Sequence, residues 1–207
     1  MFITLEGIEG SGKTTQIRHI AEYIKSKGQD CVITREPGGT GIGKKIRTIL
    51  LDSNSKGLDP SAELLLYVAD RVQHVNEVIR PALSLGKIVL CDRYFDATVA
   101  YQGFARGIDM DLITMLHKRI VENLRPDITI LLDLPAETGL KRAWEQINNG
   151  ARTSAETRFE EEKITFHENV RAGYLELARM DPERFRIIDA AGNEKTVKED
   201  ILEALPL

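Results

Sequence analysis

The sequence predicts a three-layer α/β fold, in which a central parallel sheet of five strands is covered by helices on both faces. Five short apolar runs of strand type recur along the chain, and segments with helical apolar spacing separate nearly all of them. Because each parallel connection needs a crossover, this alternation favours a parallel sheet between two helical layers. The 207 residues, of which 42% are hydrophobic, fit one globular domain spanning residues 1–207.

The expected elements follow the apolar pattern in chain order. Strands are expected at Phe2–Glu6, Cys31–Thr34, Ile88–Cys91, Ile128–Leu132 and Phe185–Ile188. Helices are indicated by apolar side chains at helical spacing, namely Ile17, Ile20, Ala21 and Ile24, then Ile113, Leu116 and Ile120, then Val170, Tyr174, Leu177 and Ala178. The polar stretch Asn148–Thr157 lacks apolar periodicity, so we expect a mobile loop there.

Charge and hydropathy argue against two classes of protein. Lys plus Arg number 28 and Asp plus Glu number 32, a net charge of −4, which does not suit binding to nucleic acid or to an anionic membrane. Any anion must therefore be bound at a local site. The segment Met1–Leu5 has no basic flank, and no apolar run approaches the roughly 20 residues that span a bilayer. We expect a cytoplasmic protein that binds neither nucleic acid nor membrane.

Neither the cysteines nor the histidines suggest a metal site. Cys31 and Cys91 belong to apolar runs and have no second Cys or His at metal-ligand spacing, so both are expected to be buried thiols. The histidines are scattered along helical stretches and are interpreted as structural or surface residues: His19, His74, His117 and His167.

A glycine-rich loop directly after the first strand carries a phosphate-binding motif. Residues 7–14 match the pattern G-x-x-x-x-G-K-[ST], whose backbone N–H groups wrap phosphate oxygens at a helix N-terminus. A tight glycine turn is the alternative, but an apolar strand precedes the loop and a helix follows it, as the motif requires. We therefore expect a P-loop NTPase fold that binds a nucleotide, with Lys13 at the β and γ phosphates and Thr14 on Mg²⁺. The expected phosphate-binding residues are Gly7, Gly10, Ser11, Gly12, Lys13, Thr14 and Thr15.

Four further segments narrow the function. They are Thr34–Gly39 (TREPGG), Asp92–Tyr94 (DRY), Ala100–Gly103 (AYQG) and Arg106–Ile108 (RGI). In this order they resemble the thymidylate kinase family of bacterial type, and the resemblance covers essentially the whole chain. It is much more specific than the phosphate loop alone. It implies transfer of the γ-phosphoryl group of ATP to dTMP, with Mg²⁺ as cofactor, in a homodimer.

The resemblance implies that arginines hold the acceptor phosphate. Arg93 stands at the carboxyl end of a central strand, where open α/β sheets bind ligands, and would clamp the dTMP phosphate. Asp92 would support the Mg²⁺ shell or orient Arg93. Arg47 would be a second phosphate-binding arginine, for which a solvated helix arginine is the alternative. Pro37 is expected to contact dTMP.

The resemblance also implies a site for the base and the sugar. Tyr67 and Arg71, four residues apart on one helix face, would stack on thymine and hydrogen-bond to its O4. The alternative is a partly buried tyrosine beside an i,i+4 neighbour. Thr98 and Gln102 would address the edge of the base, and Tyr101 would lie against the deoxyribose.

Glu9, inside the phosphate loop, would face the 3′-OH of dTMP. On the residues alone, a solvated loop position is a strong alternative, because the variable positions of such loops are often exposed to solvent. The acceptor phosphate is mostly a dianion at neutral pH, so the reaction needs no general base. The site must instead neutralise two anions, with Lys13, Mg²⁺, Arg93 and arginines that close over the γ-phosphate.

The arginines that close over the γ-phosphate are expected in a lid at about residues 148–159. The variable positions of the phosphate loop hold no basic residue, so the chain resembles the family type that carries its basic residue in the lid. Arg152 and Arg158 are the candidates for catalysis, and Arg142 on the preceding helix is expected at ATP. Arg158 is favoured because it is expected to begin a helical segment that can aim it. Thr157 stands where the family usually has Asp, so no role for that carboxylate carries over.

Two other functions remain open on the sequence. A deoxynucleoside kinase also has a phosphate loop and an Asp-Arg pair, but it needs a base for its neutral hydroxyl acceptor, and Glu36 could be that base. The residues that follow Glu36 fit thymidylate kinases better. A nucleotide switch is disfavoured, because the sequence has no [NT]-K-x-D motif and no D-x-x-G after a strand.

Overall fold

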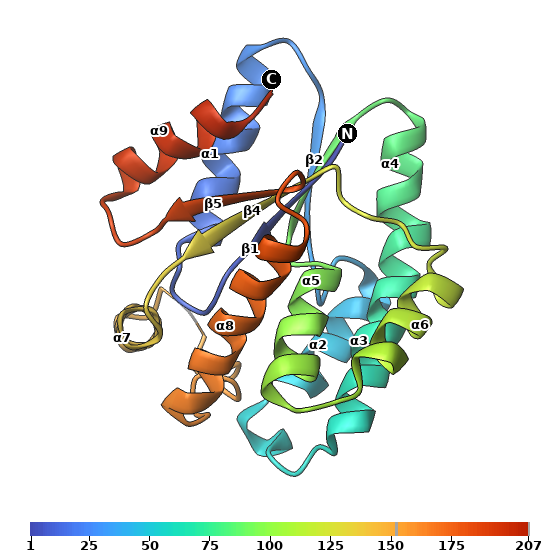
Figure 1. The fold of residues 1–207 in the computed structure, drawn as a ribbon, viewed down its shortest axis with the longest axis vertical. Helices are drawn as coiled ribbons and strands as arrows, with labels where there is room; N and C mark the ends of the chain where they lie inside the picture. Colours follow the sequence, from blue (N-terminus) through green and yellow to red (C-terminus); the bar gives the residue numbers. More distant parts are fainter. Residues whose placement is uncertain (152, 207) are drawn as a thin grey trace.

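The computed structural model describes residues 1–151 and 153–206, and in this part of the chain five parallel strands form one sheet. The strand order is β2-β3-β1-β4-β5, which puts β1 at the centre between β3 and β4. The strands are β1 (Phe2–Glu6), β2 (Cys31–Arg35), β3 (Ile88–Asp92), β4 (Ile128–Asp133) and β5 (Phe185–Asp189). Helices cover both faces (Figure 1), so the predicted fold class is confirmed.

The helices that were expected from apolar spacing all form. The α-helices described are α1 (Lys13–Ser26), α2 (Gly41–Leu51), α3 (Pro60–His74), α4 (Arg80–Ser84), α5 (Phe95–Thr98), α6 (Met110–Ile120), α7 (Ala136–Asn148), α8 (Ile164–Met180) and α9 (Glu194–Ala204). A 3₁₀ turn, η1 (Ser53–Ser55), follows α2, and π-helical segments, η2 (Val75–Ile79) and η3 (Val99–Ala105), continue α3 and α5. Among the described residues, no helix has the length and apolar character needed to cross a bilayer.

The central strand β1 shows why the sheet needs two helical layers. All five of its residues are buried. Ile3 and Leu5 belong to the same apolar cluster as Ile17 of α1. Glu6, which alternation places on the opposite face, accepts a hydrogen bond of 2.8 Å from the hydroxyl of Tyr174 on α8. The strand is therefore covered by α1 on one face and by α8 on the other.

Two expectations about local structure are wrong. No helix begins at Arg158: residues 158–161 are turns, and α8 begins six residues later at Ile164. Cys91 is buried as expected, but Cys31 is partly exposed. The reason is the position of β2, which is the edge strand of the sheet and lacks a neighbour on one side.

The phosphate loop is packed against α7. Gly10 has a φ of 70°, and a Cβ atom there would collide with the backbone of Gly139 on α7. At Gly139, a Cβ atom would lie 2.5 Å from the carbonyl oxygen of Glu9 and 2.6 Å from Cδ1 of Ile8. Glycine at both positions lets the helix and the loop approach at backbone distance.

Candidate active site

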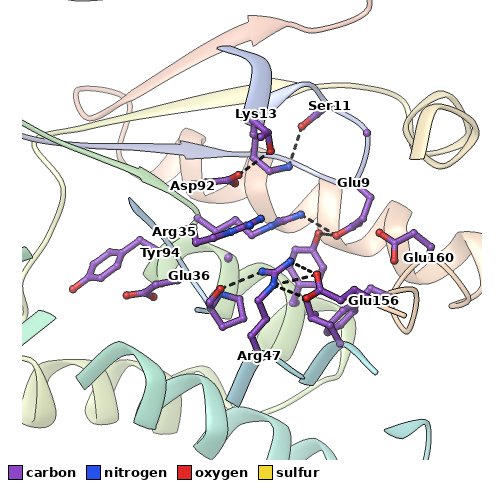
Figure 2. Close-up of a pocket in the computed structure, with 18 of the residues that line it drawn as sticks. Glu9, Ser11, Lys13, Arg35, Glu36, Arg47, Asp92, Tyr94, Glu156 and Glu160 are labelled. Carbon is purple, nitrogen blue, oxygen red and sulfur yellow. Dashed lines mark hydrogen bonds and ion pairs between the residues drawn. The ribbon is translucent and has the colours of Figure 1, made fainter. Parts of the chain in front are cut away.

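A cavity of about 580 Å³ opens at the carboxyl ends of β1, β2 and β3. This is the edge where parallel α/β sheets bind ligands. Its walls come from the phosphate loop, α2, α3, η3 and the segment after α7 (Figure 2). The predicted residues that line it are Glu9, Gly10, Ser11, Gly12, Lys13, Thr14, Thr15, Pro37, Arg47, Tyr67, Arg71, Asp92, Arg93, Thr98, Tyr101 and Gln102.

Lys13 begins α1 and bends back over the phosphate loop. Its Nζ donates to the carbonyl oxygens of Gly7 at 2.9 Å and Ile8 at 2.7 Å, and to Oγ of Ser11 at 3.1 Å. Burial and, next, the positive charge of Arg93 lower the pKa of Lys13 to about 7. The ammonium group is thus held at the place where the motif needs a cation, and a phosphate bound there would favour its charged form.

Thr14 and Asp92 form the part of the site that suits a metal ion. The hydroxyl of Thr14 donates to Oδ2 of Asp92 at 3.2 Å, and both residues line the cavity. In the described part of the chain no three His, Cys, Asp or Glu side chains cluster as metal ligands. A hydroxyl and one carboxylate fit Mg²⁺, which keeps several waters and takes its remaining oxygens from substrate phosphates.

Arg93 follows β3 directly and turns into the cavity. Its backbone φ of 68° is rare for a residue with a side chain, and such conformations concentrate at functional sites. Its Nη1 donates to the Gly7 carbonyl oxygen at 2.9 Å, and its Nη2 donates to Oε1 of Glu9 at 2.9 Å. The guanidinium also lies 4.9 Å from the ring centroid of Tyr101. The arginine is therefore held on several sides before any substrate binds.

Glu9 is buried and receives donors on both carboxylate oxygens. Oε1 accepts from Arg93 and, at 2.5 Å, from the hydroxyl of Tyr101. Oε2 lies 3.2 Å from Nδ1 of His167 on α8. Burial raises the pKa of Glu9, but Arg93 and His167 outweigh burial and hold the pKa well below its ordinary value. Glu9 is thus an ordered anion, not a solvated loop residue.

Glu36 and Arg71 form a buried ion pair in the wall of the cavity. Oε2 of Glu36 accepts from Nε of Arg71 at 2.8 Å, and Oε1 lies 2.8 Å from Nδ1 of His74. Arg71 also donates through Nη2 to the carbonyl oxygen of Tyr94 and to Oγ1 of Thr98. These bonds use Nε and Nη2, and they fix the guanidinium at the cavity wall.

Gln102 is oriented by a second buried carboxylate. Its Nε2 donates to Oε1 of Glu63 at 2.8 Å, so the amide orientation is fixed with its oxygen at the other end. Gln102 and Tyr67 both line the cavity, as expected.

Glu156 lines the cavity and forms an ion pair there, although the sequence did not single it out. Nη2 of Arg47 donates to Oε2 of Glu156 at 2.6 Å, and Nε lies 3.1 Å from each carboxylate oxygen. Nη1 donates to the carbonyl oxygen of Pro37 at 3.1 Å. Figure 2 shows Arg47 and Glu156 pointing toward each other inside the cavity. Glu156 lies in the expected lid, next to Thr157, so a carboxylate is present one residue earlier than the family pattern suggests.

Arg158 and Arg142, two of the arginines expected around ATP, do not line the cavity in this structure. Arg158 is buried, donates to the carbonyl oxygen of Leu50 and to Glu63, and does not line the cavity. In this arrangement the guanidinium of Arg158 is paired with the carboxylate of Glu63. Arg142 donates to the carbonyl oxygens of Ala190 and Ala191, after β5. Arg152 lies outside the described residues.

Other basic and polar residues of the cavity were not singled out from the sequence. Arg18 on α1, Arg35 at the end of β2 and Gln146 on α7 also line it. Arg35 lies within the TREPGG segment, and that position was the one available signal. Arg18 and Gln146 carry no local motif, since they reach the cavity only through the packing of their helices.

Comparisons with known proteins agree with this geometry. The family model described as "Thymidylate kinase" matches residues 5–201. The chain is 54% identical to the thymidylate kinase of Desulfosudis oleivorans, over 99% of this chain and 96% of that protein. It is 56% identical to that of Syntrophotalea carbinolica, over 92% and 88%. The crystal structure of thymidylate kinase from Ehrlichia chaffeensis superimposes with a TM-score of 0.78 at 33% identity, covering 99% of this chain and 97% of that one. The chain therefore belongs to the thymidylate kinase family.

Proposed function

We propose that the cavity brings the two substrates together at the phosphate loop. The enzyme transfers the γ-phosphoryl group of ATP to dTMP, forming dTDP and ADP, in dTTP biosynthesis. The observation that carries our assignment is a shared contact: Lys13 and Arg93 both donate to the carbonyl oxygen of Gly7, each at 2.9 Å. Lys13, the cation proposed for the donor phosphates, and Arg93, the cation proposed for the acceptor phosphate, thus contact the same oxygen atom. Two anions held there can meet in line.

The thymine ring would be recognised by side chains whose hydrogen bonds are already set. Arg71 uses Nε and Nη2 within the protein, so Nη1 is the group that can donate to O4 of thymine. Gln102 gives its Nε2 to Glu63, which leaves its oxygen to accept the N3–H of the base. Tyr67 offers an aromatic face for stacking. Tyr101 and Glu9, joined by a hydrogen bond, would bound the sugar.

Mg²⁺ would be held by Thr14 and Asp92 together with phosphate oxygens. When bound, the ion neutralises charge on the β and γ phosphates. Lys13 then neutralises the transferred group from the loop side, and Arg93 holds the acceptor. The lid cation remains a proposal from the sequence, with Arg152 as the first candidate and Arg158 second, because the ion pair with Glu63 must break before Arg158 could reach the phosphates.

The geometry opposes the deoxynucleoside kinase alternative. The candidate base, Glu36, forms a buried ion pair with Arg71 and lies 2.8 Å from Nδ1 of His74, so its carboxylate serves contacts within the protein. A phosphoryl-transfer screen of ATP against all nucleoside monophosphates, with thymidine in parallel, tests the function. We expect transfer to dTMP and none to thymidine. Turnover of thymidine, or preference for another monophosphate, would overturn the assignment.

We further propose that the chain forms one domain with residues 148–159 as its lid. We propose that it works as a homodimer in the cytoplasm, with ATP and dTMP as its substrates. Support for the dimer comes from apolar side chains on α3 and α6, two helices that contact each other. Leu65 is 57% exposed, Leu112 41% and Met115 50%. Light scattering should give twice the chain mass, and Leu65→Asp should halve it. A monomeric wild-type protein would exclude the dimer.

A further inference from the structure

His167 has no assigned role, yet its side chain is completely buried beside the phosphate loop. It lies in the first turn of α8, directly after the segment that contains the expected lid. Nδ1 is 3.2 Å from Oε2 of Glu9, and Nε2 is buried without a hydrogen-bond partner in the described structure. Because a carboxylate only accepts, Nδ1 carries the proton and donates to Glu9.

Packing alone does not account for an imidazole at this position. The ring of His167 packs edge-on against Phe166, with centroids 5.5 Å apart, and a phenylalanine could make the same contact. A phenylalanine would also avoid the cost of burying the unpaired Nε2. The polar atom that the imidazole contributes is the Nδ1–H directed at Glu9.

The contact completes the immobilisation of the Glu9 carboxylate. Arg93 and Tyr101 both bind Oε1, so they leave the rotation of the carboxylate about its last bond poorly defined. A donor on Oε2 fixes that rotation. Since Glu9 in turn binds Nη2 of Arg93, the histidine also acts on the arginine that faces the acceptor.

We propose that His167 is a positioning residue for the acceptor site: it locks Glu9, and through Glu9 it orients Arg93 and the sugar of dTMP. This inference rests on the proposed roles of Glu9 and Arg93. His167 does not line the cavity and reaches it only through Glu9, so we expect its effect on dTMP and not on ATP.

The test compares two variants of equal shape. Asn and Leu at position 167 are isosteric, but Asn retains a donor near the place of Nδ1 and Leu does not. We expect His167→Leu to raise KM for dTMP about tenfold and to lower kcat, the loss typical of a hydrogen bond to a charged group, with KM for ATP within twofold. His167→Asn should recover most of this loss. His167→Phe, which keeps the ring volume, should behave as Leu does.

Two controls separate positioning from mere stability. His117→Phe removes another buried histidine, which bonds the carbonyl oxygen of Leu124 away from the cavity, and should leave both KM values unchanged. In a Glu9→Gln background, replacing His167 by Leu or Phe should add less than about twofold, because the two residues act as one unit.

The discrimination between dTMP and its 3′-deoxy analogue provides an independent readout. The ratio of kcat/KM between dTMP and this analogue should fall at least several-fold in His167→Leu. It should stay near the wild-type value in His167→Asn. The inference is wrong if the Leu, Phe and Asn variants all show the same fall in melting temperature but keep the wild-type KM values and the wild-type discrimination between dTMP and its 3′-deoxy analogue. Equal losses in Leu and Asn, or effects that add fully to Glu9→Gln, would also overturn it. If the wild-type enzyme does not phosphorylate dTMP, the function assignment fails instead.

Discussion

Arg47 of α2 and Glu156 of the segment after α7 form a bidentate ion pair inside the cavity, with Nη2 and Oε2 2.6 Å apart. The pair joins residues 109 positions apart in sequence. A carboxylate presents two oxygens to a guanidinium much as a phosphate does. The carboxylate of Glu156 therefore occupies the donors of Arg47 that we propose for the acceptor phosphate.

Glu156→Gln is expected to strengthen dTMP binding. The change removes the charge that competes for Arg47, so KM for dTMP should fall about threefold or more, while Arg47→Ala should raise it. Steady-state kinetics at saturating ATP measure both. Glu161→Gln is the matched control, because it removes a neighbouring carboxylate that is paired with Lys56 outside the cavity. It should leave KM for dTMP unchanged. A higher KM in Glu156→Gln would mean that Glu156 orients Arg47 and does not compete.

ATP binding is expected to take up a proton at Lys13. With its pKa lowered to about 7, the free lysine is mostly neutral at pH 8, and the phosphates of ATP restore the charged form. Affinity for ATP should accordingly fall as the pH rises through 7. Calorimetry at pH 8 in two buffers of different ionisation enthalpy should show uptake of close to one proton. Lys13→Ala should fold, lose the uptake and retain almost no transfer activity.

The choice of base should depend on Arg71. A donor aimed at O4 distinguishes thymine from cytosine, whereas stacking on Tyr67 tolerates any base. Arg71→Ala should therefore narrow the ratio of kcat/KM between dTMP and dCMP by about tenfold or more, and Tyr67→Ala should weaken both substrates alike. An unchanged ratio in Arg71→Ala would limit this arginine to its ion pair with Glu36.

The buried Glu6 should make stability depend on pH. Burial and, next, the charge of Asp96 raise the pKa of Glu6 to about 7. The folded state then holds a proton that the unfolded state releases above about pH 4.5, so this contribution to stability is lost as the pH rises from there to 7. Glu6→Gln, which cannot ionise, should raise the melting temperature more at pH 8 than at pH 5.5, by about 2 °C or more. Equal shifts at both pH values would contradict the raised pKa.

Arg152 and Arg158 should give different kinds of defect. Arg158→Ala leaves Glu63 buried with one partner fewer, and removal of one member of a buried pair costs about 3–5 kcal/mol, so thermal unfolding should show a large loss of stability. Arg152→Ala should lower kcat by about a hundredfold or more with little change in either KM, as expected for a cation that acts in the transition state. Unchanged kcat in Arg152→Ala, Arg158→Ala and the double variant would exclude a lid arginine.

The sequence predicted those parts of the site that depend on local patterns. The phosphate loop, the strand before it and the helix after it lie in adjacent residues, so a motif and its context could be recognised together. Arg71 and Tyr67 are one helical turn apart, which a periodicity argument also reaches. The resemblance to a family then supplied Arg47, Arg93 and Gln102.

The remaining contacts join residues that are far apart in the chain. Arg158 meets Glu63 at a separation of 95 residues, and His167 meets Glu9 at a separation of 158. Local patterns carry no information about such pairs, since they arise when helices pack on a finished sheet. The partners of Arg158 were not foreseen for this reason: its surroundings in sequence are polar, but its partners come from α2 and α3.

The two helices that flank the lid both rest on the same short loop: Gly139 of α7 packs on the backbone of Glu9, and His167 of α8 bonds to its side chain. The ends of the lid are thus fixed by contacts that lie outside it. For a chain segment closed in this way, each doubling of length costs only about 0.6 kcal/mol of closure free energy. Added length at the exposed turn around Gly150 should consequently cost little free energy, whereas the buried Arg158 and its ion pair with Glu63 would have to be kept.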